Sequence, residues 1–178
     1  MDAYGTRLQV AFTAPLLALG IYLLMLVTPL TDPGRRNYPR FAGAYRLLRW
    51  GLVLFMAWIY GIWMAAALGH SVDILLAVKL SVSLLLLAIG NVMGQLRHNY
   101  FMGIRTPWTL ASEEVWRRTH RLAGRLWVLG SLICLLLSFF PGFWSAAAFI
   151  AVIVLMTLIP VVYSFMYYRS LESSGEER

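Results

Sequence analysis

Five long apolar runs decide what this chain can fold into. They cover residues 8–30, 47–68, 72–93, 122–140 and 143–167 of the 178. A helix of about 20 apolar residues crosses a hydrocarbon layer of about 30 Å. In lipid, only helices and closed barrels pair every backbone group, and a barrel would show short alternating segments instead of continuous runs. The sequence therefore predicts an all-α fold, a polytopic membrane helix bundle with five transmembrane helices, as one integral membrane domain over residues 1–178.

Most of the basic residues lie in two loops. The first loop and its margin hold Arg35, Arg36, Arg40, Arg46 and Arg49, and the second holds Arg97, Arg105, Arg117, Arg118, Arg121 and Arg125. The turns at 69–71 and 141–142 contain no Lys or Arg. Cytoplasmic loops are enriched in these residues, so both basic loops are predicted inside a bacterial cell membrane, with the N-terminus outside and the C-terminus, carrying Arg169 and Arg178, in the cytoplasm.

Membrane topology and anionic lipid headgroups already account for the net charge of +7. The partner predicted from charge is therefore the lipid bilayer and not a nucleic acid. The first run begins near Asp2 and Arg7 and is followed by no small-x-small cleavage site, so it is predicted to be retained as a span.

Asp73 and Lys79 are the charged residues of the third run, which makes them intramembrane candidates. Asp73 is expected at the outer end, and Lys79 about 10 Å deeper at 1.5 Å per residue, with a stem that can snorkel outward. Six residues apart, they do not share a helix face and cannot form an i,i+4 pair. A small transporter or channel, in which both face a water-filled cavity, stays open as an alternative, although the other runs carry no acidic residue at mid-depth.

One long polar stretch, NYFMGIRTPWTLASEEVWRRTH, spans residues 99–120. Gly103 permits unusual backbone angles, and Pro107 restricts the residue before it to extended geometry, so GIRTPWTL is predicted to be a structured loop with Trp108 as a plug or anchor. Ser112 is typical of a helix N-cap, and two glutamates follow it in the first turn. A helix is therefore expected to begin near Ser112, lie at the cytoplasmic interface and turn into the fourth span.

Helical spacing sorts the residues of this helix into three faces. The expected faces are a charged stripe of Glu114, Arg118, Arg121 and Arg125, a second stripe of Glu113, Arg117 and His120, and an apolar face of Val115, Leu122 and Leu126. The same spacing predicts i,i+4 ion pairs from Glu113 to Arg117 and from Glu114 to Arg118.

An interfacial enzyme is a further alternative, in which His120 would act with Glu113 or Glu114. No HExxH, GxSxG or comparable motif accompanies these residues. The prediction is therefore a non-enzymatic protein with no catalytic residue, no cofactor and no metal.

Gly90–Asn91 followed by NYFMGIRTPWTLASEEVWRRTHRLAG at 99–124 resembles the motif of the SdpI family of bacterial integral membrane proteins. The resemblance extends over about residues 31–165. Its type protein is an immunity factor that protects the producing cell against a secreted killing peptide. Its toxin-bound form also draws a small transcriptional repressor to the membrane. The motif positions carried over are Asn91, Asn99, Tyr100, Gly103, Arg105, Thr106, Pro107, Trp108, Thr109, Glu114, Trp116, Thr119 and His120.

The resemblance implies a membrane immunity and receptor protein, with a toxin peptide and a cytoplasmic regulator as its partners. The predicted topology places the motif on the cytoplasmic side, where a toxin arriving from outside would not meet it first. We therefore expect the polar stretch to form a folded cytoplasmic cap, built from buried polar contacts among helix ends.

Overall fold

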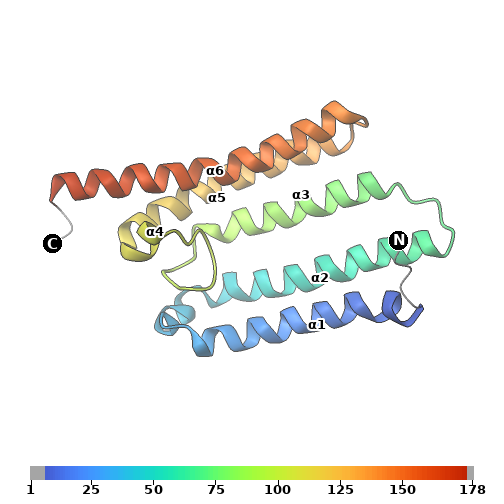
Figure 1. The fold of residues 1–178 in the computed structure, drawn as a ribbon, viewed down its shortest axis with the longest axis horizontal. Coiled ribbons are helices and arrows are strands. Elements are labelled where there is room, and N and C mark those ends of the chain that lie inside the picture. Colours follow the sequence, from blue (N-terminus) through green and yellow to red (C-terminus); the bar gives the residue numbers. More distant parts are fainter. Residues whose placement is uncertain (1–6, 176–178) are drawn as a thin grey trace, which may run out of the picture.

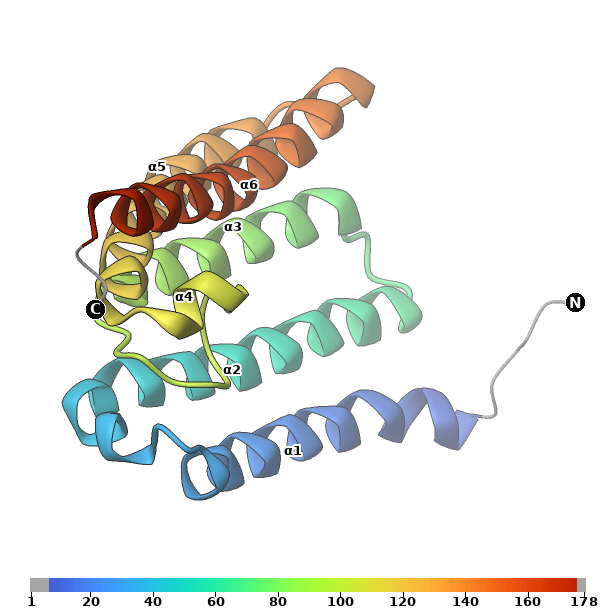
Figure 2. The ribbon, with the colours of Figure 1, turned by 60° about the vertical axis from the view of Figure 1, so that its left-hand side comes forward.

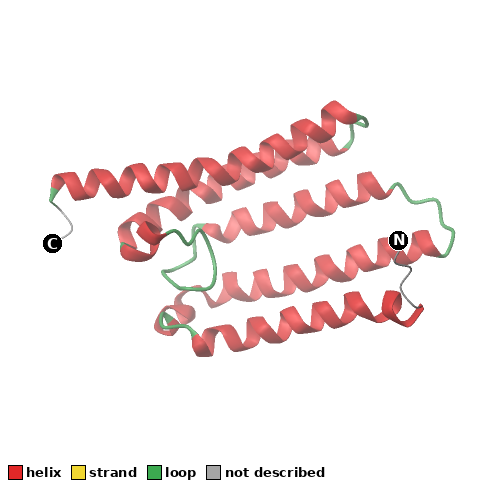
Figure 3. Cartoon of the chain, viewed as in Figure 1, coloured by secondary structure: helices red, strands yellow, loops and turns green. Residues whose placement is uncertain are grey.

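The computed structural model describes residues 7–175, and its regular elements are helices (Figure 3). The long helices are α1 (Arg7–Thr31), α2 (Ala42–Ala67), α3 (Ile74–Met93), α5 (Glu113–Ser138) and α6 (Phe143–Ser174). Within the described residues, these five are the helices long and apolar enough to cross a membrane, which confirms the predicted fold class. Asp2 and Arg178 lie outside the described residues.

Two short helices fill the connections at one end of the long ones. A 3₁₀ helix, η1 (Arg35–Phe41), joins α1 to α2, and a one-turn helix, α4 (Pro107–Ala111), lies in the longer connection between α3 and α5. We call residues 94–112 the polar connector. The turns at the opposite end, residues 68–73 and 139–142, are short and contain no helix.

The long helices of this bundle lie side by side in the order α1, α2, α3, α5, α6 (Figures 1 and 2). In the described part of the chain, the backbones of the long helices pack only against their neighbours in that order, and the contacts of α5 with α3 and with α6 are the most extensive. Lipid tails are as apolar as leucine, so no hydrophobic driving force closes such a row into a round bundle. The arrangement therefore rests on local helix-to-helix packing.

Glycines bring α3 and α5 close together. A Cβ atom added to Gly90 would lie 2.8 Å from Cβ of Trp127 and 2.9 Å from the backbone nitrogen of Val128. A Cβ atom added to Gly124 would lie 3.1 Å from the carbonyl oxygen of Gly90. Small residues at such contacts allow the two backbones to approach, which increases van der Waals contact where no hydrophobic effect operates between helices.

The main cluster of buried apolar residues lies at the end of the row that holds the polar connector. Tyr38 and Phe41 come from η1, Tyr45 from α2, Met93 from α3 and Leu96 from the polar connector. The rings of Tyr38 and Phe41 lie 4.9 Å apart, and those of Tyr38 and Tyr45 lie 5.2 Å apart. This cluster packs against the polar connector and joins it to the first three helices.

Gly90→Ala should lower the stability of the folded protein, because the added methyl group meets α5 at less than van der Waals distance. Overpacking of this kind costs about 1–3 kcal/mol. Reversible unfolding in mixed detergent micelles measures the change. The matched control is Gly61→Ala on α2, where an added Cβ meets nothing within 4 Å. Equal destabilisation by both substitutions would contradict the close α3–α5 contact.

Candidate functional site

Asn99 closes the first turn of the polar connector with its own side chain. The residue is fully buried. Its Oδ1 accepts hydrogen bonds from the backbone N–H groups of Phe101 and Met102, at 3.0 and 2.7 Å, and its Nδ2 donates to the carbonyl oxygen of Arg97 at 2.8 Å. Backbone groups in a non-helical segment need such partners when water is excluded. Asn99 thus replaces the hydrogen bonds that a helix would have supplied.

His120 holds the middle of the polar connector from α5, where it is 1% exposed. Its Nε2 lies 3.0 Å from the backbone nitrogen of Ile104, and its Nδ1 lies 2.8 Å from the carbonyl oxygen of Trp116. A backbone N–H can only donate, so Nε2 is the acceptor and carries no proton, whereas Nδ1 donates. The imidazole is therefore neutral, with both ring nitrogens engaged by the backbone. It also stacks on Trp116, with ring centroids 4.1 Å apart.

Gly103 lies against this imidazole in a conformation that favours glycine. Its φ is +106°, and an added Cβ atom would lie only 2.2 Å from Nε2 of His120. Both the backbone angle and the contact exclude a side chain here. The glycine thereby allows the N–H of the next residue, Ile104, to reach the ring.

The sequence predicted a loop from 103 to 110, and that prediction was wrong at 107–110, because α4 (Pro107–Ala111) forms there. Pro107 is the first helical residue, where its missing N–H is not needed and its fixed φ favours the helix. The N-cap is Thr106, whose Oγ1 accepts from the backbone N–H of Thr109 at 3.4 Å, while Oγ1 of Thr109 accepts from that of Thr106 at 2.9 Å. This reciprocal pair is a capping box, formed here by two threonines.

Trp108 attaches α4 to α6. The indole Nε1 donates to Oγ of Ser164 at 2.6 Å, and the ring lies edge-on to Phe165 at 5.1 Å between centroids. The anchoring role expected for Trp108 thus has a specific partner, a serine 56 residues further along the chain.

Trp116 and His98 fix the two ends of the polar connector relative to each other. Nε1 of Trp116 donates to the carbonyl oxygen of Leu96 at 3.0 Å. Nε2 of His98 lies 2.9 Å from the carbonyl oxygen of Leu110, the end of α4. The two rings pack at 5.2 Å between centroids. This side of α5 is therefore a buried platform and not a solvated stripe.

Asp32 is the buried group that the sequence reasoning missed. It follows α1, is 2% exposed, and accepts three hydrogen bonds: from the N–H of Gly34 at 2.6 Å, the hydroxyl of Tyr38 at 2.8 Å and the N–H of Tyr100 at 3.1 Å. A neighbouring bond runs from Nδ2 of Asn37 to the carbonyl oxygen of His98, at 2.8 Å. Asp followed by Pro-Gly is typical of a turn closed by the aspartate side chain, and that signal was available.

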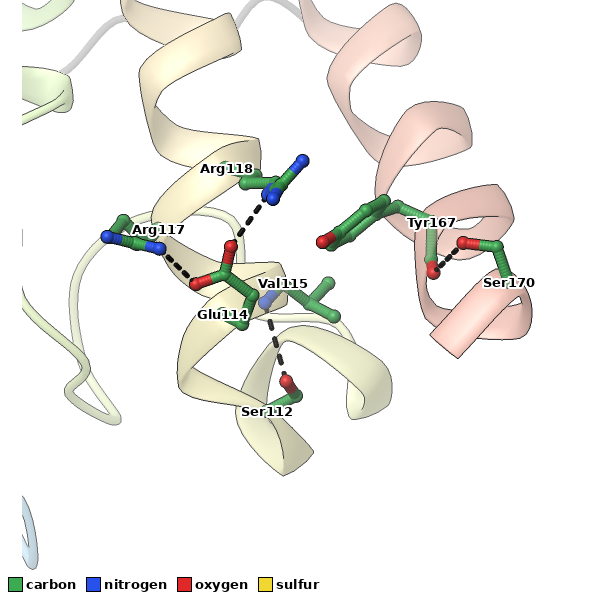
Figure 4. Close-up of polar contacts among 7 residues, drawn as sticks. All are labelled: Ser112, Glu114, Val115, Arg117, Arg118, Tyr167 and Ser170. Atoms are coloured by element: carbon green, nitrogen blue, oxygen red, sulfur yellow. Dashed lines mark hydrogen bonds and ion pairs between the residues drawn. The ribbon is translucent and has the colours of Figure 1, made fainter. Parts of the chain in front are cut away.

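The charged residues at the start of α5 pair differently from the prediction (Figure 4). Arg118 bonds Glu114 at 2.6 Å, as expected, and its guanidinium carbon lies 4.7 Å from the centre of the Tyr167 ring. Arg117 bonds Glu114 and not Glu113, because the i,i+3 position lies equally close on a helix. In residues 7–175 these are the ion pairs present, so Arg121 and Arg125 have none.

The predicted faces of α5 also need correction. The buried residues near its start are Val115, Trp116, Thr119, His120, Ala123 and Gly124, whereas Leu122 and Leu126 are half-buried. His120 therefore does not belong to an exposed stripe with Glu113 and Arg117. The reason is that α5 packs against α3 on one side and α6 on the other, which buries a wider face than one apolar stripe suggests. The helix runs unbroken from Glu113 into the span, so the interfacial helix expected before the fourth span is the first part of α5 itself.

Asp73 and Lys79 are not brought together. Asp73 is the exposed N-cap of α3 and accepts from the N–H of Leu76 at 2.9 Å. Lys79 is 5% exposed, and its Nζ donates to the carbonyl oxygens of Leu137 and Phe140 and to Oγ of Ser145, at 2.8, 3.2 and 3.0 Å. Lys79 therefore caps the C-terminus of α5, where a cation is favoured, instead of snorkelling into water.

The motif residues differ in exposure, and Thr106, Trp108 and Glu114 are half-buried. Asn99, Thr109, Trp116 and His120 are buried and hold the polar connector in shape, whereas Thr119 is buried on α5 with its hydroxyl unpaired among the described residues. Asn91, Tyr100 and Arg105 are exposed, and Arg105 donates from Nη1 to the carbonyl oxygen of Tyr100 at 2.7 Å. Within residues 7–175, no three His, Cys, Asp or Glu side chains gather as a metal site would require. The buried residues form a hydrogen-bonded cap, and the exposed ones form a surface on it. His120 bonds to backbone groups and Glu114 to two arginines, so the two side chains do not act together.

Comparison with known proteins finds a family match over the part of the chain that holds this site. Residues 95–165 match the SdpI/YfhL protein family, a range that holds the polar connector from Gln95 on, α5 and most of α6. The chain is also 36% identical over 108 residues to the Immunity protein SdpI of Bacillus subtilis (strain 168), a match that covers 61% of this chain and 52% of the relative. The chain thus spans about half the length of the curated relative it matches. No solved structure matches it.

Gly103→Ala should open the polar connector, because the added methyl group would occupy the position of His120 Nε2 and remove the hydrogen bond from Ile104. Limited proteolysis should then cleave between residues 94 and 112 at protease concentrations that leave the parent protein intact. The control is Gly69→Ala, which also has a positive φ, +87°, but has nothing within 4 Å of its added Cβ. That control carries only the backbone strain, about 1–2 kcal/mol. Identical cleavage of the two variants would contradict the tight Gly103–His120 contact.

Proposed function

Residues 95–165 match the SdpI/YfhL protein family, and from this premise we propose that the chain is a non-enzymatic membrane immunity protein. It protects the bacterium that produces it against a secreted antimicrobial peptide. The observation that carries the proposal is the 36% identity over 108 residues to a relative named an immunity protein. The buried hydrogen-bond network of the polar connector supports it, since the motif residues build a shape and not a reaction centre.

The contacts of the titratable groups favour binding over chemistry. A general base needs a free lone pair within reach of a substrate proton. Both ring nitrogens of His120 are taken by the backbone, and Glu114 is held by two arginines on the exposed side of α5. Lys79, the buried cation of α3, is held by three oxygens around the α5–α6 turn, so it does not supply the ion pathway that a transporter would need.

The orientation that we propose puts the polar connector in the cytoplasm. Both arginine-rich loops and the C-terminal end of α6 lie at one end of the row, and the turns 68–73 and 139–142 at the other contain no Lys or Arg (Figure 1). We name these the arginine-rich end and the arginine-free end. The positive-inside rule then gives a multi-pass protein of the bacterial cell membrane with its N-terminus outside and its C-terminus inside.

Toxin and regulator then meet opposite ends of the protein. A secreted peptide reaches the arginine-free end or the membrane-embedded faces first, whereas Tyr100, Phe101 and Arg105 are exposed at the arginine-rich end and form the surface proposed for a cytoplasmic regulator. A ligand shifts a conformational equilibrium only by its difference in affinity for the two states. The peptide would therefore bind preferentially the state in which this surface accepts the regulator.

Single-cysteine labelling tests the orientation. In a Cys134→Ser background, Ser71→Cys at the arginine-free end should react with a membrane-impermeant maleimide on intact cells. Arg36→Cys in η1 should react only after the membrane is opened. The reversed pattern would contradict the proposed orientation. Cys134 is buried in α5, so replacing it does not change the exposed surface of the protein. The replacement ensures that the maleimide reacts only with the introduced cysteine.

Survival of a sensitive bacterium that expresses the chain tests the function. Expression should protect cells exposed to a secreted killing peptide against which SdpI-type immunity proteins act. Arg105→Ala should weaken signalling to a repressor-controlled reporter while keeping the protein folded, because Arg105 is exposed and donates to the carbonyl oxygen of Tyr100 on the surface. The control is Arg36→Ala, which removes one exposed arginine at the same end. Unchanged killing at matched membrane levels of the chain would contradict immunity, and equal reporter loss in both variants would contradict a specific role for Arg105.

A further inference from the structure

A surface groove runs between α3 and α5 near the arginine-rich end. Its volume is about 580 Å³, and its polar side is formed by Asn91, Arg121 and Arg125. Arg121 and Arg125 lie one helical turn apart on α5, and Asn91 faces them from the last turn of α3. None of these three side chains takes part in the hydrogen-bonded cap described above.

The floor of the groove is backbone. Gly90, Gly94 and Gly124 line it, and a Cβ atom added to Gly94 would lie 3.8 Å from Cα of Arg121. Cβ atoms added to Gly90 and Gly124 would point into the α3–α5 contact, so these glycines let the two backbones meet at the bottom of the groove. The glycines that pack α3 against α5 thus also create a recess beside the guanidinium groups.

The charge in this recess is uncompensated. Arg117 and Arg118 share Glu114, but in residues 7–175 Arg121 and Arg125 have no acidic partner. Like charges at i,i+4 on a helix repel each other. Asn91 is exposed as well and is a motif residue that the cap does not use. An anion held between the two arginines would remove the repulsion, and the Asn91 amide could donate to the same group.

The position of the groove along the helices identifies the anion. Asn91 lies within the last turn of α3, which ends at Met93, so the polar part of the groove is at the level of the lipid headgroups. Val128 and Leu129 continue the groove toward the membrane interior, and Leu129 is 60% exposed. A polar recess above an exposed apolar strip has the profile of a phospholipid, with its phosphate at the top and an acyl chain below.

We propose that this groove binds the headgroup of an anionic phospholipid such as phosphatidylglycerol. The guanidinium groups of Arg121 and Arg125 donate to the phosphate oxygens, as arginine does bidentately, and Asn91 donates from the opposite wall. One acyl chain lies along Val128 and Leu129. Basic pockets between membrane helices at the cytoplasmic side suit such headgroups. The bound lipid bridges α3 and α5 directly beneath the polar connector.

Native mass spectrometry of the full chain, titrated in detergent with phosphatidylglycerol, tests the proposal. The double substitution Arg121→Gln and Arg125→Gln should weaken lipid binding by about tenfold or more, since hydrogen bonds to charged groups are among the stronger ones. The control is Arg35→Gln with Arg36→Gln, which removes the same charge at the same end outside the groove. Equal weakening by both double variants would overturn the proposal, because the effect would then come from the overall positive charge of this end and not from the groove.

Further arms separate lipid from free anion and keep the test valid if the arginine variant folds poorly. Asn91→Asp leaves both arginines in place and should also weaken phosphatidylglycerol binding, by adding a negative charge to the recess. Phosphatidylcholine should bind the parent protein at least about tenfold more weakly than phosphatidylglycerol, because its headgroup has no net charge. Inorganic phosphate at the same concentration should not compete. Competition by phosphate alone, equal binding of phosphatidylcholine, or no effect of Asn91→Asp would each overturn the proposal.

Discussion

The whole arginine-rich end depends on one requirement, that the backbone of the polar connector find hydrogen-bond partners where no helix supplies them. An unpaired backbone group shielded from water costs about as much as the hydrogen bond it lacks. Asn99 satisfies three backbone groups from within the connector, and His120 reaches one from α5. Asp32 satisfies another from the end of α1. Because these side chains come from different elements, the connector keeps its shape only while those elements keep their places.

The same bonds hold the row of helices together where helix packing does not. In the described residues α1 contacts α2, and η1 packs against both, but α1 has no contact with α3 or α5. The hydrogen bonds of Asp32 to Tyr100 and of Asn37 to the carbonyl of His98 join this first pair of helices to the connector. On the other side, Trp108 joins the connector to α6 through Ser164. At the arginine-free end, Lys79 ties α3 to the α5–α6 turn through Leu137, Phe140 and Ser145.

Hydropathy predicted the five membrane helices because a span must be apolar over the full thickness of the hydrocarbon layer. Such a requirement produces long apolar runs that can be read directly from the sequence. It placed two starts late, at 47 instead of Ala42 and at 122 instead of Glu113. Both helices begin with arginine-bearing turns, which lie outside the hydrocarbon and lack the apolar signal. The cap at Ser112 was predictable because an N-cap is a local interaction, and its Oγ accepts from Val115 as expected.

The candidate site was less predictable because its important contacts are remote. Asp32 could be recognised as a turn residue, but its partner Tyr100 lies 68 residues away, beyond the reach of any spacing rule. His120 was assigned to a charged stripe, since a helical wheel does not reveal that α5 is covered on two sides. Gly103 was recognised as a permissive residue, yet the imidazole against which it packs could be identified only from the tertiary structure. Resemblance selected the polar stretch as the candidate site, and in the structure some of its residues support the connector while others are exposed.

The sequential order of the helices also has a consequence for how the protein is made. Each long helix packs beside the one synthesised just before it, so the nascent chain can be added to the membrane one helix at a time without rearranging what is already there. The buried carboxylate of Asp32 is an exception. Its partner Tyr100 leaves the ribosome only after α2 and α3, so until then the donors available to Asp32 from the structure are Gly34 and Tyr38. The bond from Trp108 to Ser164 forms only with α6, so translation of the final helix is the step that completes the cap. The bond from Lys79 to Ser145, at the opposite end, also waits for α6.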